Sequence, residues 1–252
     1  MKVGRFVALI VPKSLLSTPE FNKTREIMSK YRIEKICDYG EKAFKIKIET
    51  ISFIINTTLS KSEMVNNKVK IESYITKSTK HLPQQYICCT KYPYWLIYRN
   101  DFLDKVSEKL IFNIFTTFRD RQITKKLLRE NGKYRVLKSR NIDNLKIVKR
   151  NGHDKYVDDI KNLNIRKILN KKNYILIPNL TYFPRACFLP RNCITDGSVA
   201  IAILRNGYHI TKDDLAYYSS NEFREFYRVA RNLSSRTMNI DSNSIFFFGK
   251  QK

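Results

Sequence analysis

One short stretch of the sequence carries polar side chains at a spacing that suits phosphate binding. It follows an apolar run that ends at Pro12, and it holds Lys13, Ser14, Ser17 and Thr18. A lysine beside several hydroxyls can hold phosphate groups, and α/β sheets bind their ligands at the carboxyl ends of strands. Capping of the following helix explains Ser17 and Thr18 equally well, so both interpretations stay open.

Cysteine and histidine chemistry is not indicated. The five cysteines form no Cys-x-x-Cys pair, and the three histidines are isolated in the sequence. They match neither zinc spacing nor a nucleophile with a nearby base. An odd number of cysteines is typical of a reducing compartment, in which thiols serve as small apolar side chains. We expect no metal site. The apolar run at the N-terminus is too short for a membrane span or a signal peptide, so we expect a cytoplasmic protein without a membrane partner.

The charge of the chain indicates a polyanionic partner. Its 252 residues include 48 Lys and Arg against 23 Asp and Glu, which gives a formal net charge of +25. Such a surplus favours binding to nucleic acid. The 42% of hydrophobic residues is enough for a sizeable core, which excludes a disordered tail.

The elements that would position these side chains begin at the N-terminus. Phe6 to Val11 is a continuous apolar run, typical of a strand covered on both faces. We expect a helix over Phe21 to Tyr31, then strands over Ile33 to Tyr39 and Thr50 to Asn56 around a turn at Gly40. This pattern indicates the second half of a doubly wound α/β sheet without its first half. The first strand therefore pairs with another polypeptide, or the chain is a piece of a longer one.

This order of features resembles the region after the catalytic Asn-Pro-Pro-Tyr motif in adenine-N6 DNA methyltransferases of type II and IIS restriction–modification systems. That family shows a strand ending in Val-Pro, a Ser/Thr-rich loop, a helix with an arginine, a strand, a Gly-Glu…Phe loop and a last strand. The matching residues here are Val11-Pro12, Ser14 to Thr18, Arg25, Ile36 to Asp38, Gly40-Glu41 with Phe44, and Glu49 to Ile55. The resemblance implies a partial class I (Rossmann-like) methyltransferase sheet. We expect Arg25 to form an ion pair on the helix surface.

By this resemblance, Phe44 is the aromatic that stacks on the flipped adenine, and the nearby Lys45 and Lys47 contact DNA. The alternative is that Phe44 caps the sheet as an ordinary core residue. The family's Gly-rich cofactor loop and its Asn-Pro-Pro-Tyr motif are absent from all 252 residues. S-adenosyl-L-methionine would thus be bound mainly by a missing N-terminal half, with no cofactor-binding residue in this chain. The chain alone is expected to be inactive.

The rest of the chain resembles the target-recognition region of the same enzymes. Gly132 to Ile142 is similar to its opening, Tyr174 to Val199 to its later strands, and Ser219 to Gly249 to the C-terminal helix and tail of type IIS adenine methylases. We therefore expect a methyltransferase α/β part over residues 1–80 and an α+β target-recognition domain over residues 81–252. Residues 57–80 look like a polar connector with at most one strand. The aromatic cluster in residues 81–98 forms either a packed sub-core between domains or a DNA-facing surface.

Several residues of this region have the chemistry to contact DNA. Arginine can bind guanine through two hydrogen bonds, while Lys, Ser and Tyr commonly position phosphates. The candidates are Lys138, Arg140, Tyr182, Arg185, Arg191, Ser198 and Arg231. A solvated basic face would look the same, and Asp196-Gly197-Ser198 can be a plain turn. A helix over Glu222 to Arg231 would carry Arg224, Arg228 and Arg231 on one basic face, which either meets solvent or lies along phosphates.

Three functions fit the sequence. The first is the C-terminal, target-recognition part of a site-specific adenine-N6 DNA methyltransferase. It would bind duplex DNA, work with an N-terminal methyltransferase half as a separate chain, and have a cognate restriction endonuclease as a further partner. The second is a non-catalytic, sequence-specific DNA-binding module. The third is a basic RNA-binding protein.

Overall fold

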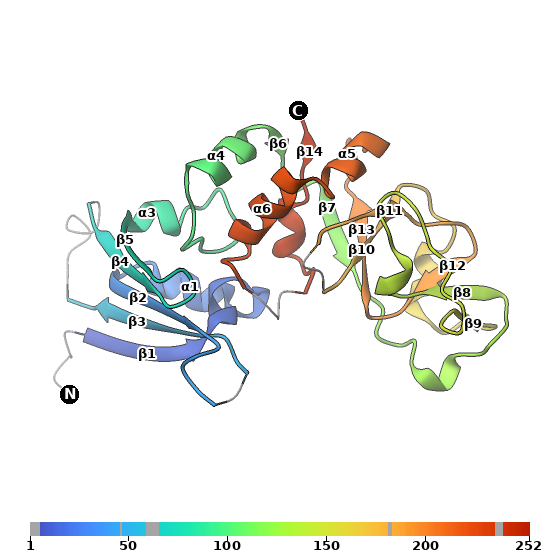
Figure 1. The fold of residues 1–252 in the computed structure, drawn as a ribbon, viewed down its shortest axis with the longest axis horizontal. Coiled ribbons are helices and arrows are strands. Elements are labelled where there is room, and N and C mark those ends of the chain that lie inside the picture. The colour runs from blue at the N-terminus through green and yellow to red at the C-terminus, as the bar shows by residue number, and fades with distance from the viewer. Residues whose placement is uncertain (1–5, 46, 59–65, 181–182, 235–238) are drawn as a thin grey trace. The chain divides into compact units, whose positions relative to one another are not determined.

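The computed structural model describes residues 6–45, 47–58, 66–180, 183–234 and 239–252. Its elements form two compact units (Figure 1). Unit 1 comprises Met1–Asp101 with Val229–Ser234, and unit 2 comprises Phe102–Arg228 with Ser235–Lys252. The chain is a mixed α/β protein with one five-stranded mixed sheet and several smaller sheets.

Unit 1 is built on the five-stranded sheet, whose order is β1-β3-β2-β4-β5. Its strands are β1 (Phe6–Pro12), β2 (Arg32–Gly40), β3 (Thr50–Asn56), β4 (Lys68–Ser73) and β5 (Ser78–Pro83). Strand β3 is antiparallel to both β1 and β2, so β1 and β2 run in the same direction, and β4 is parallel to β2. The carboxyl ends of β1, β2 and β4 therefore lie at the same end of the sheet. We call this end the carboxyl edge, and it is where α/β folds bind ligands.

The connection from β1 to β2 contains a short helix, as parallel strands require. After two 3₁₀ turns, α1 (Asn22–Met28) begins one residue later than the predicted helix and ends earlier. Thr18 precedes the turn that begins with Pro19, but its side chain makes no capping hydrogen bond. The predicted surface position of Arg25 is wrong. Arg25 is buried, and its guanidinium donates to the carbonyl oxygens of Leu15 (2.6 Å) and Thr18 (3.0 Å).

The prediction that strand β1 is covered on both faces is wrong. The strand lies at the edge of the sheet, pairs only with β3 among the described residues, and leaves Phe6 58% and Ile10 63% exposed. Its odd-numbered residues are partners of Ile51, Phe53 and Ile55, which are buried. One long edge and one apolar face of β1 are thus left for a further strand and a covering layer, as an incomplete sheet would have them.

We predict that this surface makes the isolated chain self-associate. The double variant Phe6→Gln, Ile10→Gln should shift the chain toward monomer without lowering its melting temperature, because both side chains are exposed. Sedimentation velocity at high salt, where charge repulsion is screened, measures this. Tyr208→Gln, an exposed aromatic of unit 2, is the matched control and should leave self-association unchanged. A wild-type chain that stays monomeric at its highest soluble concentration would contradict the prediction.

The stretch predicted to be a connector is part of the sheet instead. Within residues 57–80, β4 and the beginning of β5 form an antiparallel hairpin, and β4 adds to β2. The alternating Val69 and Ile71 are buried, which is the reason for their spacing. Residues 59–65, which the same prediction covers, lie outside the described residues.

The aromatic cluster after β5 is packed inside unit 1. Tyr92, Tyr94, Trp95 and Tyr98 are each less than a tenth exposed, beside helix α3 (Gln84–Ile87). Trp95 meets Phe53 of β3 edge to face, with ring centroids 6.2 Å apart. A packed sub-core is therefore the correct alternative for these four residues, within unit 1 rather than between domains.

Among the described residues, unit 2 contains three smaller sheets and most or all of three α-helices. A four-stranded sheet has the order β11-β10-β13-β7, a three-stranded sheet β12-β8-β9, and a two-stranded sheet β14-β6. The strands are β6 (Leu110–Ile111), β7 (Phe115–Phe118), β8 (Tyr134–Leu137), β9 (Lys155–Val157), β10 (Tyr174–Pro178), β11 (Cys187–Phe188), β12 (Cys193–Thr195), β13 (Val199–Leu204) and β14 (Lys250–Gln251). The helices are α4 (Asp101–Glu108), α5 (Lys212–Tyr217) and α6 (Asn221–Ala230). The first residue of α4 and the last two of α6 belong to unit 1.

Two apolar clusters stabilise unit 2. One is aliphatic and joins the strands β8, β10, β12 and β13 through residues such as Val136, Leu176 and Ile201. The other is aromatic: Phe223 of α6 contacts Tyr218 and Phe248, with ring centroids 5.0 and 5.3 Å apart. The buried Phe223, Phe226 and Tyr227 therefore form the apolar face of α6 that packs inward.

The basic face predicted on α6 holds for two of its three arginines. Arg224 and Arg228 are exposed, but Arg231 follows the end of the helix and is only 7% exposed. The chain turns there, since Asn232 and Leu233 adopt left-handed backbone conformations (φ 53° and 54°). Helical spacing therefore does not apply to Arg231, and its placement on the exposed face is wrong.

Candidate nucleic-acid interface

In unit 1, the loop after β2 presents Phe44 to solvent. Gly40 has a left-handed backbone (φ 59°), which glycine adopts without strain. The backbone N–H of Gly40 donates to Asp38 Oδ1 (3.0 Å), so the carboxylate fixes the start of the loop. Phe44 is 53% exposed, and Lys45 and Lys47 are exposed beside it. The loop thus offers an aromatic ring flanked by positive charge, which suits a nucleobase next to phosphates.

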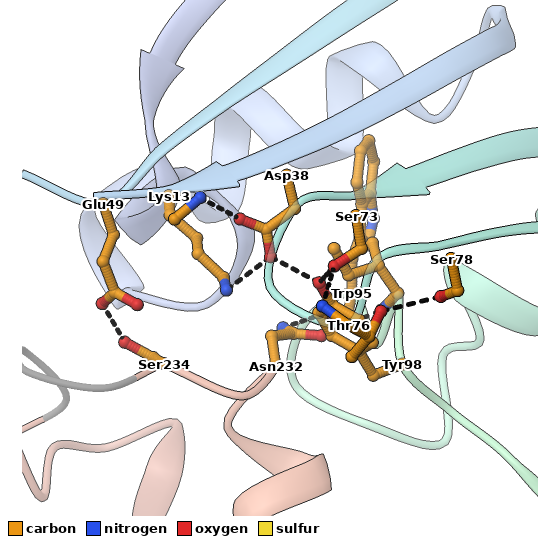
Figure 2. Close-up of polar contacts among 12 residues, drawn as sticks. Lys13, Asp38, Glu49, Ser73, Thr76, Ser78, Trp95, Tyr98, Asn232 and Ser234 are labelled. Atoms are coloured by element: carbon orange, nitrogen blue, oxygen red, sulfur yellow. Dashed lines mark hydrogen bonds and ion pairs between the residues drawn. The ribbon is translucent and has the colours of Figure 1, made fainter. Parts of the chain in front are cut away.

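A buried polar network holds this edge of the sheet together (Figure 2). Asp38 Oδ2 accepts from Lys13 Nζ (2.6 Å) and from the Tyr98 hydroxyl (2.7 Å). The Tyr98 hydroxyl also lies 2.6 Å from Ser73 Oγ. Burial, and next the neighbouring Asp38, raise the pKa of Tyr98 well above its ordinary value, so the phenol stays a neutral donor. The network connects the carboxyl ends of β1, β2 and β4.

The chain segment after α6 joins the same unit. Asn232 accepts from the Ile97 backbone N–H (2.9 Å) and donates to the Trp95 carbonyl oxygen (2.8 Å). Ser234 Oγ donates to the buried Glu49, which lies just before β3 (Figure 2). These contacts explain why residues 229–234 belong to unit 1.

A pocket of about 380 Å³ opens at the same edge of the sheet. Its lining is rich in cations and hydroxyls: Lys42, Glu72, Ser73, Tyr74, Lys77, Ser78 and Thr79. The Glu72 carboxylate lies 2.6 Å from Lys35 Nζ and 2.7 Å from Lys70 Nζ. Hydrogen bonds from these two lysines lower the pKa of Glu72. Neither lysine lines the pocket, so the negative charge of Glu72 is balanced by groups outside it. The pocket is therefore suited to an anion.

The residues at this edge do not fit S-adenosyl-L-methionine. The seven glycines of the chain are scattered, so no Gly-rich loop can form beside a strand. Lysines line the pocket where a cationic sulfonium would meet repulsion.

In unit 2, several predicted DNA contacts come together around the 3₁₀ turn Ser139–Asn141, which follows β8. Lys138 and Arg140 flank Ser139, whose backbone N–H donates to Ser198 Oγ (3.0 Å). Arg185 donates through Nη2 to the Ser139 carbonyl oxygen (3.3 Å). Four residues predicted separately thus meet at one place. Arg140 is exposed, whereas the other three are partly buried.

Arg185 anchors this cluster. Its Nε donates to the Ile142 carbonyl oxygen (2.7 Å) and its Nη1 to that of Phe183 (3.2 Å). Burial lowers the pKa of Arg185, an effect that the nearby Asp143 opposes. Ser198 is held in the same way: its hydroxyl donates to Asp196 Oδ1 (2.6 Å), which also accepts from the Ser198 backbone N–H. Asp196 to Ser198 therefore forms a turn, and contact of Ser198 with DNA stays a prediction.

The remaining predicted contacts lie elsewhere. Lys13 is only 3% exposed and ion-paired to Asp38, and Arg231 is buried, so neither side chain is at the surface. Arg191 is exposed, but it comes before β12 in the chain. Ser198, which belongs to the cluster around Ser139, comes after that strand. Tyr182 lies outside the described residues. Burial argues against DNA contact by Lys13 and Arg231, whereas contact by Arg191 and Tyr182 stays a prediction.

Sequence reasoning missed the residues that position the Phe44 loop. Asp38 lies in a strand that also carries Arg32, Glu34 and Lys35, and Tyr98 belongs to an aromatic cluster explained by packing alone. A carboxylate next to the apolar Ile36 and Cys37 requires a partner when it is buried, and this was the available signal. It could not identify Lys13, which is 25 positions away.

Within the described residues, no group of three or more His, Cys, Asp and Glu is arranged to hold a metal ion. The helices of that same part are all too short or too polar to cross a membrane. The five cysteines are free thiols, and burial raises the pKa of Cys187 to about 12.

No protein-family model and no curated protein matches this sequence. Among solved structures, the chain is similar to the Type IIL restriction-modification enzyme MmeI, solved in complex with DNA, with a TM-score of 0.50 and 10% identity. The match covers 96% of this chain and 38% of MmeI, so the chain spans about two fifths of that enzyme. A weaker likeness to the type IIG restriction endonuclease BpuSI has a TM-score of 0.36 and 10% identity, covering 98% of this chain and 40% of BpuSI. The likeness to MmeI concerns the fold, that of part of a restriction-modification enzyme.

Proposed function

We propose that this chain is the C-terminal, target-recognition part of a site-specific adenine-N6 DNA methyltransferase of a restriction–modification system. The observation that carries the proposal is the open, apolar edge strand β1. A strand with the composition of a sheet interior lies at the edge of the sheet and keeps Phe6 and Ile10 exposed. Native proteins normally cover or pair an apolar edge strand of this kind, so we infer that further strands and helices complete the sheet.

The order of elements in unit 1 supports the same proposal. Strand β1, the helix with Arg25, strand β2, the Gly40-Glu41 loop with Phe44, and strand β3 follow one another as the resemblance implies. The fold likeness to MmeI, which extends over nearly the whole chain, is consistent with a piece of a longer enzyme. The boundary predicted near Lys80 falls inside β5, so the methyltransferase part would correspond to unit 1 and the target-recognition part to unit 2.

In this proposal, the residues of the chain bind and orient DNA. Phe44 stacks on the extruded adenine, because its ring is exposed at the carboxyl edge of the sheet. Lys45 and Lys47 neutralise phosphates on either side of that base. The Lys13–Asp38 pair fixes the loop that carries Phe44, and is thus a positioning device. In unit 2, Lys138, Arg140, Arg185 and Ser198 contact the target site.

An N-terminal half supplies what the chain lacks. That half would carry the Gly-rich loop and the Asn-Pro-Pro-Tyr motif, and S-adenosyl-L-methionine bound to it would provide the methyl group. It is either a separate chain or a preceding segment of a longer one. A cognate restriction endonuclease is a further proposed partner.

Reconstitution tests the proposal. The chain is mixed with a separately expressed N-terminal half, and transfer of labelled methyl groups to unmethylated duplex DNA is measured. We expect transfer by the mixture and none by either chain alone. Methyl transfer by neither the mixture nor the fused halves would contradict the enzymatic role.

Binding experiments separate the alternatives. The chain alone should bind duplex DNA with an affinity that falls steeply with salt, since each neutralised phosphate contributes a slope of about −0.9 in log–log form. Sequence-selective binding without partner-dependent methylation would instead favour a non-catalytic specificity module. A preference for structured RNA over duplex DNA would favour an RNA-binding protein.

A further inference from the structure

The loop between β10 and β11 in unit 2 is fixed at both ends. At its start, Asn179 is 4% exposed, donates its backbone N–H to the Ser198 carbonyl oxygen (2.9 Å), and donates Nδ2 to Asn239 Oδ1 (2.7 Å). At its end, Arg185 donates to three backbone carbonyl oxygens. Both ends are thus held by polar side chains in the interior.

Between these anchors, the loop exposes large apolar side chains. Leu180 is 59% exposed and Phe183 is 56% exposed. Two large apolar side chains exposed on the same anchored loop form a candidate contact surface. Arg224 of α6 lies over the Phe183 ring, with Cζ 4.1 Å from the ring centroid. A cation at that distance stabilises the ring in its exposed position.

The charges around Phe183 indicate the kind of partner. Arg185, Arg140 and Lys138 belong to the cluster at the end of the loop, and Arg224 covers the ring. An aromatic ring and arginine planes together form the combination on which nucleobases stack, and the surrounding cations match phosphates. Arg140 and Arg224 are exposed, so this surface is positively charged and complements phosphates better than it would a neutral protein surface.

We infer that Phe183, supported by Arg224 and accompanied by Leu180, inserts into an opened base step of the bound duplex. This inference rests on the proposed DNA-binding function and adds to it that the chain unstacks DNA at a second place, distinct from the Phe44 site. Insertion of an apolar side chain costs unstacking free energy. The additional protein surface that the distorted duplex contacts offsets this cost.

A pair of mixed-sequence duplexes tests the inference in the full chain. One duplex is intact, and the other carries a central abasic gap beside a 2-aminopurine, whose fluorescence rises when it loses its stacking partner. Wild-type chain should bind the gapped duplex roughly 5-fold to 100-fold more tightly, which corresponds to base–aromatic stacking. It should also change the 2-aminopurine signal, because the ring occupies the gap.

The variant Phe183→Ala should lose both the preference and the signal while its affinity for the intact duplex changes little. Phe183→Trp should retain them. Tyr208→Ala, another exposed aromatic of unit 2, should behave as wild type. Equal preference and signal in Phe183→Ala and wild type would overturn the inference and leave the proposed function standing. Failure of wild type to bind either duplex would overturn both.

Discussion

Replacing Asp38 with alanine should unfold unit 1 at a much lower temperature. The substitution leaves the Lys13 ammonium buried at 3% exposure without its carboxylate, and it removes acceptors from Tyr98 and from the Gly40 backbone N–H. Breaking a buried ion pair on one side costs about 3–5 kcal/mol. For a unit of this size, the midpoint of thermal unfolding should fall by about 10 °C or more. Differential scanning calorimetry measures this.

Two control variants test whether the lost buried ion pair causes the fall in melting temperature. Glu26→Ala breaks the exposed pairs of Glu26 with Lys23 (3.4 Å) and Lys30 (3.8 Å), and should change the stability by no more than about 1 kcal/mol. The double variant Lys13→Met, Asp38→Leu replaces both buried charges and should recover much of the loss, because it leaves no uncompensated charge. An Asp38→Ala chain that melts like wild type would show that the network does not hold the sheet edge.

Replacing Phe44 with alanine should reduce methyl transfer by the reconstituted enzyme by about 5-fold to 100-fold. The estimate follows from the ~1–3 kcal/mol by which an aromatic ring stabilises a stacked base. The 53% exposure of Phe44 means that the folded chain should keep its melting temperature. Steady-state methyl transfer to unmethylated duplex DNA measures the effect, and Phe44→Trp should retain most activity because a larger ring preserves stacking.

The matched control for Phe44 is Ile48→Ala in the same loop. Ile48 is 44% exposed and apolar, but it has no ring to stack. Its substitution should leave methyl transfer close to wild type. If Phe44→Ala transferred methyl groups as fast as Ile48→Ala, the base-stacking role of Phe44 would be refuted, whatever the fate of the target-recognition part.

Local sequence patterns were sufficient for the strands of the opening segment. Apolar runs and turn residues predicted β1, β2 and β3 within one or two residues, because these signals depend on side chains close in sequence. The turn at Gly40 followed from the same logic, and the structure gives it a left-handed backbone. The hairpin of β4 and β5 was missed since its residues are mostly polar, with burial only at alternate positions of β4.

Burial and pairing could not be predicted locally. Lys13 was expected at a phosphate-binding surface, but its position depends on Asp38, which only the folded sheet brings to it. The exposed state of β1 depends on the order of strands in the sheet, which places β1 at an edge beside β3, and no local pattern specifies that order. In unit 2, side-chain chemistry alone made candidates of Lys138, Arg140, Arg185 and Ser198. Their convergence around Ser139 arises from the long-range pairing of β8 with β12, which the local sequence does not reveal.

The central claim is that another polypeptide segment completes the sheet along β1. Amide hydrogen exchange of residues 6–12, measured with and without the N-terminal half, tests this most directly. We predict that the amides on the open edge of β1 exchange rapidly in the chain alone and become strongly protected when the half is added, while β4 and β5 change little. Unchanged exchange in β1 upon formation of a complex that methylates DNA would contradict the claim.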